Sequence, residues 1–364
     1  MRVLVLTKYP NEGASSRYCV LQYLPWLRAN GFECDSFPLY STALFRLSLS
    51  PGKRLRKFLL FAVAIIQRAW VVLTAESYDL ILMHREALPF GPPMLERLLK
   101  WKGIPVVFTY DDALFLFKPN QSNKLANWFK RPDKYLEIFS LVDCVVAANP
   151  WLKEKAGVYC KDSRFLAAAE DLGRFTAKAN YQGESSGSVI LGWIGSPSTE
   201  KYLRTISGPL RKLTRKHPGL KLRIVGGSKG FRMDGVCIEQ VEWSLESEVG
   251  SLHSFDIGLM PLPKEEWSKG KSGGKARAYM AVGLPAVCSE IGFNNELINH
   301  GETGFLVSSE TDWVSCLDVL ISDVQLRKEI GQSARRYIED NLSTDTIAPK
   351  LARILTEVST RSPQ

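Results

Sequence analysis

Short apolar runs that alternate with stretches of helical periodicity constrain the fold of this chain more than any other feature. The first half contains four such runs, RVLVLT (2–7), YDLILM (78–83), GIPVVFTY (103–110) and DCVVAA (143–148). Continuous apolar runs are typical of strands that are buried on both faces of a parallel sheet. The alternation restarts with VILGWIG, KLRIVGG, FDIGLMPL and LPAVCS. Two successive series of strands and helices predict two doubly wound α/β domains.

Chain length and one polar stretch indicate where the domains divide. A chain of 364 residues is too long for one typical core. NYQGESSGS (180–188) is polar and rich in glycine and serine, as linkers are. We therefore expect a first domain over 1–180 and a second over 181–344. Within the first domain, the pattern predicts one helix over 16–30, ended by Gly31.

The net charge of +9 lies entirely in the first half of the chain. Residues 1–180 hold 25 lysines and arginines against 16 aspartates and glutamates, and the remaining residues hold 22 of each. This distribution favours an anionic surrounding for the first domain, although a solvated basic surface gives the same count. Nucleic acid is disfavoured because no basic stretch is interleaved with aromatic residues.

Cysteine usage and the N-terminus bear on the compartment. The seven cysteines are scattered without a CxxC pair, and the four histidines do not cluster. This argues against disulfides and structural zinc, and it favours a reducing compartment. The apolar run in MRVLVLTKYP is too short for a signal peptide. We expect a cytoplasmic protein, and the sequence carries no indication of its oligomeric state.

Residues 51–75, PGKRLRKFLLFAVAIIQRAWVVLTA, place four basic residues ahead of a long apolar run. A membrane-spanning helix needs about 20 continuous apolar residues, and Gln67 and Arg68 interrupt this run near its centre. We favour a mostly buried helix of the first domain. The second interpretation is peripheral contact with the inner, anionic face of a membrane, made by Lys53, Arg54, Arg56, Lys57 and the residues 58–61 that follow them.

KGKSGGK (269–275) combines three lysines with three glycines just ahead of a helix expected over about 275–282. Backbone N–H groups at a helix start have no partner within the helix, so such a start binds anions. The lysines add full positive charges. The segment therefore predicts a site for a diphosphate, with a solvated basic loop as the competing interpretation.

Several motifs in order resemble the retaining GT-B glycosyltransferases of family four. KARAYMAVGLPAV, IGFNNELI and GETGFLV are similar to the C-terminal signature of that family, and GWIGSPSTEKYL is similar to its first C-domain strand and glycine loop. EGASSRYCVLQYLPWL, HREALPFGPP and VVFTYDDALF resemble a bacterial branch. The resemblance spans nearly the whole chain. It implies two Rossmann-like domains that face each other across a cleft, with a C-terminal helix over about 345–364 that packs back on the first.

The resemblance implies a donor site in the second domain. Gly195 and Ser196 match the loop that approaches the donor phosphates, Lys201 matches a common lysine, and Glu296 matches a position near the donor-bearing helix. Lys201 can also be interpreted as a residue on a helix surface. Glu296 can be interpreted as an acidic residue at the start of a helix. Many relatives have an arginine where Ser196 stands, so a phosphate contact must come from elsewhere.

Lys271 and Lys275 are the expected replacements for that cation, together with the amides of Gly273 and Gly274. The resemblance implies transfer with retention of configuration and without a metal. The donor phosphate itself would receive the acceptor proton, so the protein would act by stabilising the leaving diphosphate. We expect a UDP- or GDP-sugar as co-substrate and no other cofactor.

In the first domain, the resemblance places the glycine loop at Gly13, and it places Asp111 where relatives have a histidine near the transferred sugar. We therefore expect Asp111 to be catalytic. Polar residues near other strand ends are expected to bind the acceptor or the sugar: Arg17, His84, Arg85 and Asp112. Each also has a structural interpretation, such as a solvated arginine, a structural histidine or a helix cap.

Ala278 departs from the family, which usually has Glu or Gln there to bind the ribose hydroxyls. Losing one charged hydrogen bond costs about 1.5–3 kcal/mol. Three alanines at 167–169 also replace the usual polar residues. We expect a glycosyltransferase that acts on a glycan, lipid-linked or small-molecule acceptor. A weak or inactive relative acting as a partner subunit is the alternative, and a sugar-nucleotide epimerase is a more distant one.

Overall fold

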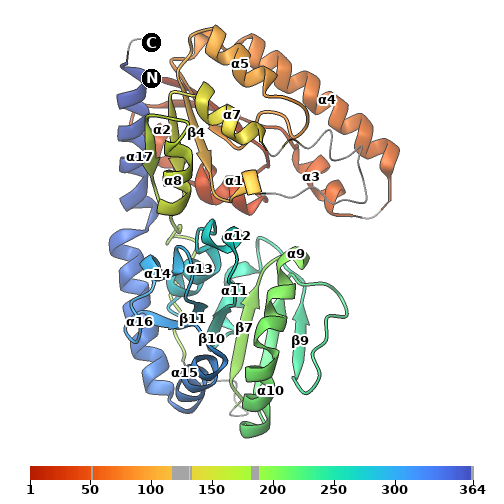
Figure 1. Cartoon of the computed structure of the whole chain (residues 1–364), viewed down its shortest axis with the longest axis vertical. Coiled ribbons are helices and arrows are strands. Elements are labelled where there is room, and N and C mark those ends of the chain that lie inside the picture. Colours follow the sequence, from red (N-terminus) through yellow and green to blue (C-terminus); the bar gives the residue numbers. More distant parts are fainter. Residues whose placement is uncertain (51, 117–130, 132, 182–187, 362–364) are drawn as a thin grey trace. The chain divides into compact units, whose positions relative to one another are not determined.

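The computed structural model describes residues 1–50, 52–116, 131, 133–181 and 188–361. It divides into two compact units, Met1–Ala169 with Thr344–Gln364, and Glu170–Ser343. Each unit is a six-stranded parallel sheet with helices around it, which confirms the predicted pair of Rossmann-like units (Figure 1). The boundary lies at Ala169–Glu170 rather than at 180. Most of the predicted linker, 182–187, lies outside the described residues.

The sheet of unit 1 has the order β2-β1-β3-β4-β5-β6. All its pairings are parallel. Because β2 and β3 lie on opposite sides of β1, the chain reverses its direction of winding there, and ligands of such sheets bind where the winding reverses. The strands are β1 (Arg2–Thr7), β2 (Glu33–Pro38), β3 (Leu80–His84), β4 (Val106–Tyr110), β5 (Cys144–Ala147) and β6 (Ser163–Phe165).

The helices of unit 1 include the C-terminal one, α17, which contacts α2, β3 and β4. The helix predicted over 16–30 is interrupted instead: α1 ends at Cys19, a 3-10 turn covers Leu21–Tyr23, and α2 follows. Pro25 lies in the first turn of α2, where a missing N–H costs nothing. The helices are α1 (Ala14–Cys19), α2 (Leu24–Ala29), α3 (Thr42–Leu49), α4 (Arg54–Leu73), α5 (Met94–Trp101), α7 (Lys134–Leu141), α8 (Pro150–Gly157) and α17 (Thr344–Ser359).

The sheet of unit 2 has the order β12-β11-β10-β7-β8-β9, again with parallel pairings, so its winding reverses between β7 and β10. The strands are β7 (Ile190–Ile194), β8 (Lys221–Val225), β9 (Ile238–Val241), β10 (Ile257–Met260), β11 (Ala286–Ser289) and β12 (Gly304–Val307). The helices are α9 (Pro197–Glu200), α10 (Ser207–Lys216), α11 (Glu248–His253), α12 (Glu266–Lys269), α13 (Gly274–Ala281), α14 (Asn294–Leu297), α15 (Glu310–Ser322) and α16 (Val324–Asn341).

Helix α13 is seated on the sheet of unit 2 by one buried aromatic residue, Tyr279. Its ring packs on Gly258 of β10, where an added Cβ would lie 2.4 Å from the ring. Its hydroxyl accepts a hydrogen bond from the Ile194 amide (3.2 Å) and donates one to the Leu259 carbonyl (3.1 Å). Tyr279 therefore fixes α13 against β7 and β10, the two strands where the winding reverses.

Helix α4 is the helix predicted within 51–75, but the favoured prediction that it is mostly buried is wrong. Only Ala64, Arg68 and Val72 are buried. Arg68, which interrupts the apolar run, donates to the carbonyls of Thr7 (2.7 Å) and Phe37 (2.8 Å). The arginine thus ties α4 to β1 and β2. Among the described residues, no helix is both long and apolar enough to cross a membrane.

Replacing Arg68 with methionine tests this anchor. The change leaves the Phe37 carbonyl without its side-chain donor in a half-buried position. We expect the free energy of unfolding to fall by about 2–3 kcal/mol. The protein loses a hydrogen bond from a charged group, and it leaves a carbonyl acceptor without a donor. Equilibrium urea unfolding measures this loss. The neighbouring exposed Gln67→Ala is the control and leaves stability unchanged; an equally stable Arg68→Met protein would show that the anchor is dispensable.

Candidate functional site

Some of the predicted donor residues of unit 2 gather where β7 ends and α13 begins. Gly195 directly follows β7, and the side chain of Lys275, in the first turn of α13, passes over it. A Cβ added at Gly195 would lie 2.9 Å from the Cε of Lys275 and 2.6 Å from the Trp193 ring. Only glycine leaves room for this approach. The structure therefore brings Gly195 and Lys275 together.

Both lysines of the predicted diphosphate loop lie over tryptophan rings. The ammonium of Lys275 is 5.2 Å from the centroid of Trp193, and that of Lys271 is 4.9 Å from the centroid of Trp267. Cation–π contacts of this kind favour a defined position for a flexible lysine. Neither lysine is fully buried. The pattern of the sequence singled out the lysines but not the two tryptophans that hold them.

The start of α13 has the features of an anion-binding helix terminus. The residue before the helix is Gly273, which adopts a left-handed conformation with φ of 70°, and no acidic residue occupies the first turn. The first backbone N–H groups of a helix carry a partial positive charge and lack a carbonyl one turn earlier. The helix begins at Gly274, one residue before the expected start.

A buried ion pair holds the loop from inside. Arg277 is 1% exposed and Glu170 is fully buried. The Nε of Arg277 lies 3.2 Å from Oε1 of Glu170, and its Nη1 donates to the Ser272 carbonyl. Arg277 therefore braces the turn between Lys271 and Lys275. Ala278, beside it, is also buried and has no polar side-chain atom.

Strand β11 and helix α14, which follow α13 in the chain, also make contacts that support the segment ahead of α13. Ser289, at the end of β11, accepts a hydrogen bond from the Leu262 amide (2.9 Å), and Asn294 donates to the Ser289 carbonyl (2.9 Å). Gly292 has φ of 59°, and a Cβ there would lie 2.9 Å from the Ser268 carbonyl oxygen. These supports were not expected from the sequence, because each is a common residue type in an ordinary turn.

The Gly195 amide and the three remaining predicted donor residues make contacts with other parts of unit 2. The Gly195 amide donates to the Val225 carbonyl (3.0 Å), so this N–H belongs to the backbone at the end of the sheet. Ser196 is exposed and hydrogen-bonds the Ser198 hydroxyl (2.8 Å). Lys201 is exposed over the Tyr202 ring, 5.5 Å from its centroid. Glu296 is exposed on α14. Burial raises the pKa of Tyr337 on α16, and the negative charge of Glu296 raises it further.

Unit 1 has its own polar cluster at the carboxyl ends of β1, β3 and β4. His84, the last residue of β3, is fully buried between two hydroxyl groups. Its Nε2 is 2.8 Å from Ser15 Oγ, and its Nδ1 is 2.8 Å from Thr109 Oγ1. Burial lowers the pKa of His84 to about 4. The imidazole is therefore neutral near pH 7, with both nitrogens engaged.

Arg85 and Asp111 form an ion pair next to this histidine. The Nη2 of Arg85 is 2.8 Å from Oδ1 of Asp111 and 3.4 Å from Oδ2 of Asp112. Burial alone would raise the pKa of Asp111, but the charge of Arg85, the neighbouring His84 and hydrogen bonds from Ser15 and Arg85 together hold this pKa well below its usual range. Arg85 has a left-handed φ of 63°, which is costly for a residue with a side chain and is found at functional sites.

A second buried set of charges lies beside the pair and was missed in the sequence. Glu86 is 4% exposed, accepts from Lys8 Nζ (2.7 Å) and also accepts from the hydroxyl of Tyr135. Lys134 donates to the Leu88 carbonyl (2.7 Å). Burial would raise the pKa of Glu86, but the charges of Lys8 and Lys134 lower it overall. Glu86 comes two residues after His84 at the end of the same strand, which is the signal that could have identified it.

Gly13 and Arg17 shape the loop after β1. A Cβ at Gly13 would lie 2.3 Å from the Cβ of Tyr9, so only glycine fits. Arg17 is buried rather than solvated, and its Nη1 donates to the carbonyls of Asn11 (2.8 Å) and Glu12 (3.3 Å). Arg17, predicted to bind an acceptor, therefore holds the glycine loop itself.

Three potential metal-ligand atoms lie within 4.8 Å of one another, contributed by Cys19, His84 and Asp111. Protein groups already engage this set, since Ser15 hydrogen-bonds His84 and Arg85 pairs with Asp111. An ion here would have to replace both contacts. The expected independence from metal stays a prediction.

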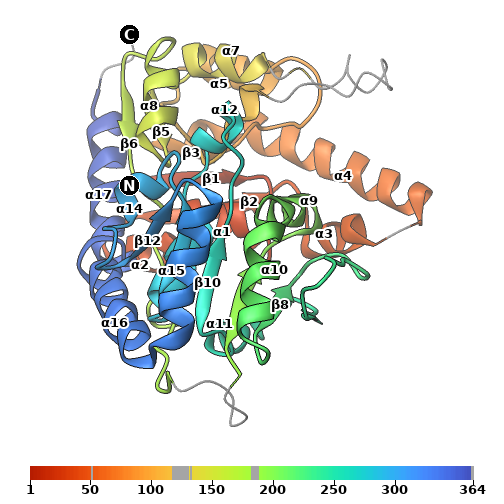
Figure 2. The same cartoon turned by 60° about the horizontal axis from the view of Figure 1, so that its bottom comes forward.

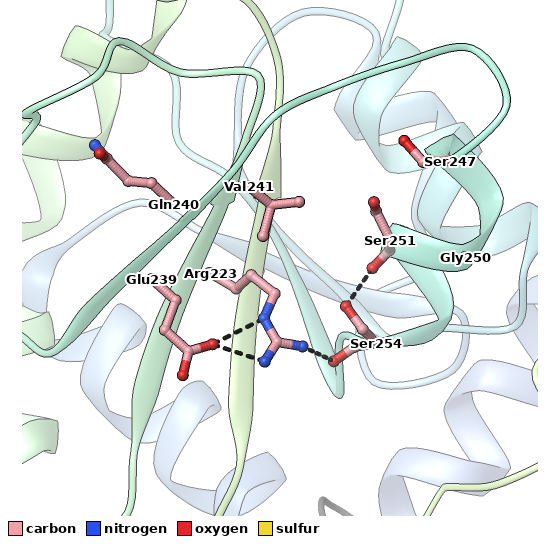
Figure 3. A pocket seen from close by; sticks show the side chains of 8 residues that line it. All are labelled: Arg223, Glu239, Gln240, Val241, Ser247, Gly250, Ser251 and Ser254. Carbon is pink, nitrogen blue, oxygen red and sulfur yellow. Dashed lines mark hydrogen bonds and ion pairs between the residues drawn. The ribbon is translucent and has the colours of Figure 1, made fainter.

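One open pocket of about 550 Å³ lies in unit 2, away from the predicted residues (Figure 3). Arg223 of β8 occupies it and pairs with Glu239 of β9, at 2.6 Å and 2.9 Å. The third guanidinium nitrogen donates to the Ser254 carbonyl (3.3 Å). The lining residues come from β8, β9 and the region of α11, and they include none of the predicted site residues.

The buried pair of Glu170 and Arg277 yields a stability prediction. Glu170→Gln leaves the guanidinium buried without its counter-charge, so we expect a loss of about 3–5 kcal/mol in the free energy of unfolding. Arg277→Met has a similar cost, and the Glu170→Met/Arg277→Met protein loses less than the sum of the two. Urea unfolding measures all three. Lys229→Ala, which breaks the exposed pair with Glu242, is the control and has no measurable effect.

Burial of neutral His84 predicts a dependence of stability on pH. Its pKa is about 4 in the fold against an ordinary 6.5, so between these values the unfolded chain binds the extra proton. Stability therefore falls as the pH drops from about 6.5 to 4, by up to about 3 kcal/mol. Urea midpoints across this range measure the slope. The slope flattens in His84→Gln and persists in the exposed His300→Gln; an equal slope in both variants would contradict the assignment.

Part of unit 2 matches a known family model. Residues 188–323 match the family model described as glycosyl transferases group 1. A D-inositol 3-phosphate glycosyltransferase from Paenarthrobacter aurescens (strain TC1) is 33% identical over 88 residues, covering 24% of this chain and 20% of that protein. Glycosyltransferase 1 domain-containing protein 1 of Xenopus tropicalis is 27% identical over 157 residues, covering 39% and 44%. The matches thus span less than half the length of either relative.

Solved structures resemble the chain over nearly its whole length. A sucrose-phosphate synthase from Thermosynechococcus elongatus has a TM-score of 0.67 at 16% identity and covers 98% of both chains. A glycosyltransferase from Rickettsia africae ESF-5 has a TM-score of 0.71 at 14% identity, covering 99% of both. Anabaena HepE in complex with UDP and glucose has a TM-score of 0.65 at 16% identity, covering 97% and 99%. The chain therefore has the GT-B fold, and its residues 188–323 match the model of the glycosyl transferases group 1 family.

Proposed function

We propose that this protein is a glycosyltransferase that moves a sugar from a nucleotide-sugar donor to an acceptor. The observation that carries the proposal is the start of α13. Two lysines held over tryptophans and a glycine-led helix terminus lie at the point where the winding of a Rossmann-like sheet reverses. The matched family segment includes all of these residues.

The donor in this proposal is a UDP- or GDP-sugar, and no other cofactor is required. Solved HepE structures of similar fold contain UDP and UDP-glucose, which supports a nucleotide diphosphate for this chain. Lys275 has the better-defined place of the two lysines, because its stem is fixed between Gly195 and Trp193. We assign Lys275 the diphosphate and Lys271 a second, supporting charge.

The proposed mechanism is transfer with retention and without a metal ion. The acceptor hydroxyl attacks the anomeric carbon on the face that the diphosphate leaves, and the leaving phosphate oxygen takes the hydroxyl proton. The protein lowers the barrier by stabilising the charge that develops on the diphosphate. Lys271, Lys275 and the N–H groups at the start of α13 supply that stabilisation.

In unit 1, we propose that the carboxyl ends of β3 and β4 contact the acceptor or the transferred sugar. Neutral His84 positions Ser15 and Thr109 through its two ring nitrogens and does not act as an acid, because its pKa is far below 7. Asp111 stays ionised beside Arg85 and offers a carboxylate to sugar hydroxyls. The proposed acceptor is a glycan or a lipid-linked or small molecule, and the proposed location is the cytoplasm with peripheral membrane contact.

Ala278 favours a second candidate function, a GT-B relative of weak or no activity that acts as a partner subunit. The position lacks the carboxylate or amide that the resemblance leads one to expect for ribose binding. The nearby carboxylate of Glu170 does not replace it, because Arg277 engages that group inside the unit. A sugar-nucleotide epimerase is less favoured, since His84 is neutral with both nitrogens engaged.

Titration calorimetry with UDP, GDP and ADP tests the donor proposal. We expect heat from UDP or GDP, and in Lys275→Met we expect about 10- to 150-fold weaker binding, because one charge-assisted contact is worth about 1.5–3 kcal/mol. The exposed Lys328→Met in the same unit is the control and leaves the dissociation constant unchanged. Absence of heat for all three nucleotides would favour the inactive partner subunit over the enzyme.

A further inference from the structure

Helix α4 presents an apolar face to solvent along its whole length. Ten of its residues are exposed, and seven of these are apolar. Six form a stripe with spacings of three and four residues, which places them on one side of a helix; each is between 50% and 72% exposed, and we call them the α4 stripe: Leu55, Leu59, Val63, Ile66, Trp70 and Leu73. Soluble proteins rarely expose a continuous apolar patch of this kind without a partner.

The opposite face of α4 is packed against the rest of unit 1. The helix therefore cannot rotate to bury the stripe. Ala64 belongs to a small core with Leu39 and Leu44, and Leu60 and Phe61 pack against it. Arg68 is anchored to the carbonyls of Thr7 and Phe37. α4 also contacts α3 and α5 along the edge of the unit (Figure 2). Leu60 and Phe61, which the second interpretation of residues 51–75 included in the lipid contact, therefore pack against unit 1 instead.

The charges of α4 itself and of its start are all of one sign. Helix α4 contains no acidic residue, and Lys53, Arg54, Arg56 and Lys57 cluster at its start. Of these, Lys53, Arg54 and Arg56 are exposed. An apolar stripe with basic residues at one end and an exposed tryptophan near the other is typical of helices that lie in the plane of a membrane interface. A helix of 20 residues provides about 30 Å of such contact.

From this surface we infer that unit 1 docks on an anionic lipid bilayer through the α4 stripe, with α4 parallel to the membrane plane. The stripe enters the boundary between headgroups and acyl chains, and the basic cluster contacts anionic headgroups. Arg68 explains why the helix lies on the membrane and does not cross it, because its guanidinium is held within the protein. The inference uses unit 1 alone and does not depend on the proposed transfer reaction.

A second copy of this chain is the main competing occupant, because spacings of three and four residues also suit helix pairing. The charges favour lipid instead. A protein partner would have to supply acidic groups to match the basic cluster, and α4 itself supplies none. Anionic headgroups supply that complement directly.

Co-sedimentation of the full chain with vesicles of phosphatidylglycerol and phosphatidylcholine tests the inference. We expect binding at low salt, little binding to pure phosphatidylcholine, and at least a tenfold weaker partition for Leu59→Ser/Ile66→Ser/Trp70→Ser. Each basic residue near the surface contributes about a fivefold factor, so Arg54→Gln/Arg56→Gln should also weaken binding at least tenfold. These side chains are exposed, so the variants fold, as circular dichroism checks.

Matched controls use exposed residues elsewhere on the chain. Val158→Ser and Val319→Ser remove exposed apolar side chains, and Lys328→Gln/Arg336→Gln removes two exposed charges from α16. These variants bind vesicles like the wild-type protein. Absence of wild-type binding to anionic vesicles, or unchanged binding by the stripe variant, would overturn the inference. A dimer in the absence of lipid that the stripe variant abolishes would assign the stripe to a second copy instead.

Discussion

Parallel strand pairing is the constraint on which the rest of this structure depends. In both sheets every pairing among the described residues is parallel, so each strand ends at the same edge as its neighbours. Residues that follow β1, β3 and β4 are thereby gathered in unit 1, and residues that follow β7 and β10 in unit 2. The central strands consist mostly of buried apolar side chains. Chemistry is consequently confined to the carboxyl edges, where His84, Asp111 and Gly195 lie.

Buried arginines fix these edges in place. Arg277 binds Glu170 and the Ser272 carbonyl, Arg68 binds two carbonyls in unit 1, and Arg85 binds Asp111. A guanidinium suits this role because its planar array of donors can satisfy several acceptors at once. Burying a charge is costly unless it is fully paired, so each of these side chains holds its partners firmly. The groups left accessible, such as Lys271 and Lys275, lie in the loop before α13 and in its first turn, which Arg277 braces from within.

Much of the fold was predictable, and the exceptions share a cause. Every strand expected from a continuous apolar run is present, whereas the four that were missed, β2, β6, β9 and β12, are the edge strands of the two sheets. Edge strands are covered less completely, and three of these four lack that run, as the partly exposed IEQV of β9 shows, whereas β12 is a short apolar run of four residues, GFLV. In the site, the lysines and glycines of 269–275 identified Lys275, and the family resemblance identified Gly195, but Trp193 and Glu170 looked like ordinary core and loop residues. Their roles arise from contacts between distant segments, which no local pattern encodes.

The exposed face of α4 was misjudged for a similar reason, because hydrophobic content alone does not tell which side of a helix the protein covers.

The central claim is that a nucleotide diphosphate binds at the start of α13. A crystal structure of the protein with UDP or GDP tests it most directly. The account predicts diphosphate oxygens within hydrogen-bonding distance of the Lys275 ammonium and of the first N–H groups of α13, beside Gly195. A well-ordered nucleotide whose diphosphate lies elsewhere, for example in the pocket around Arg223, would contradict it.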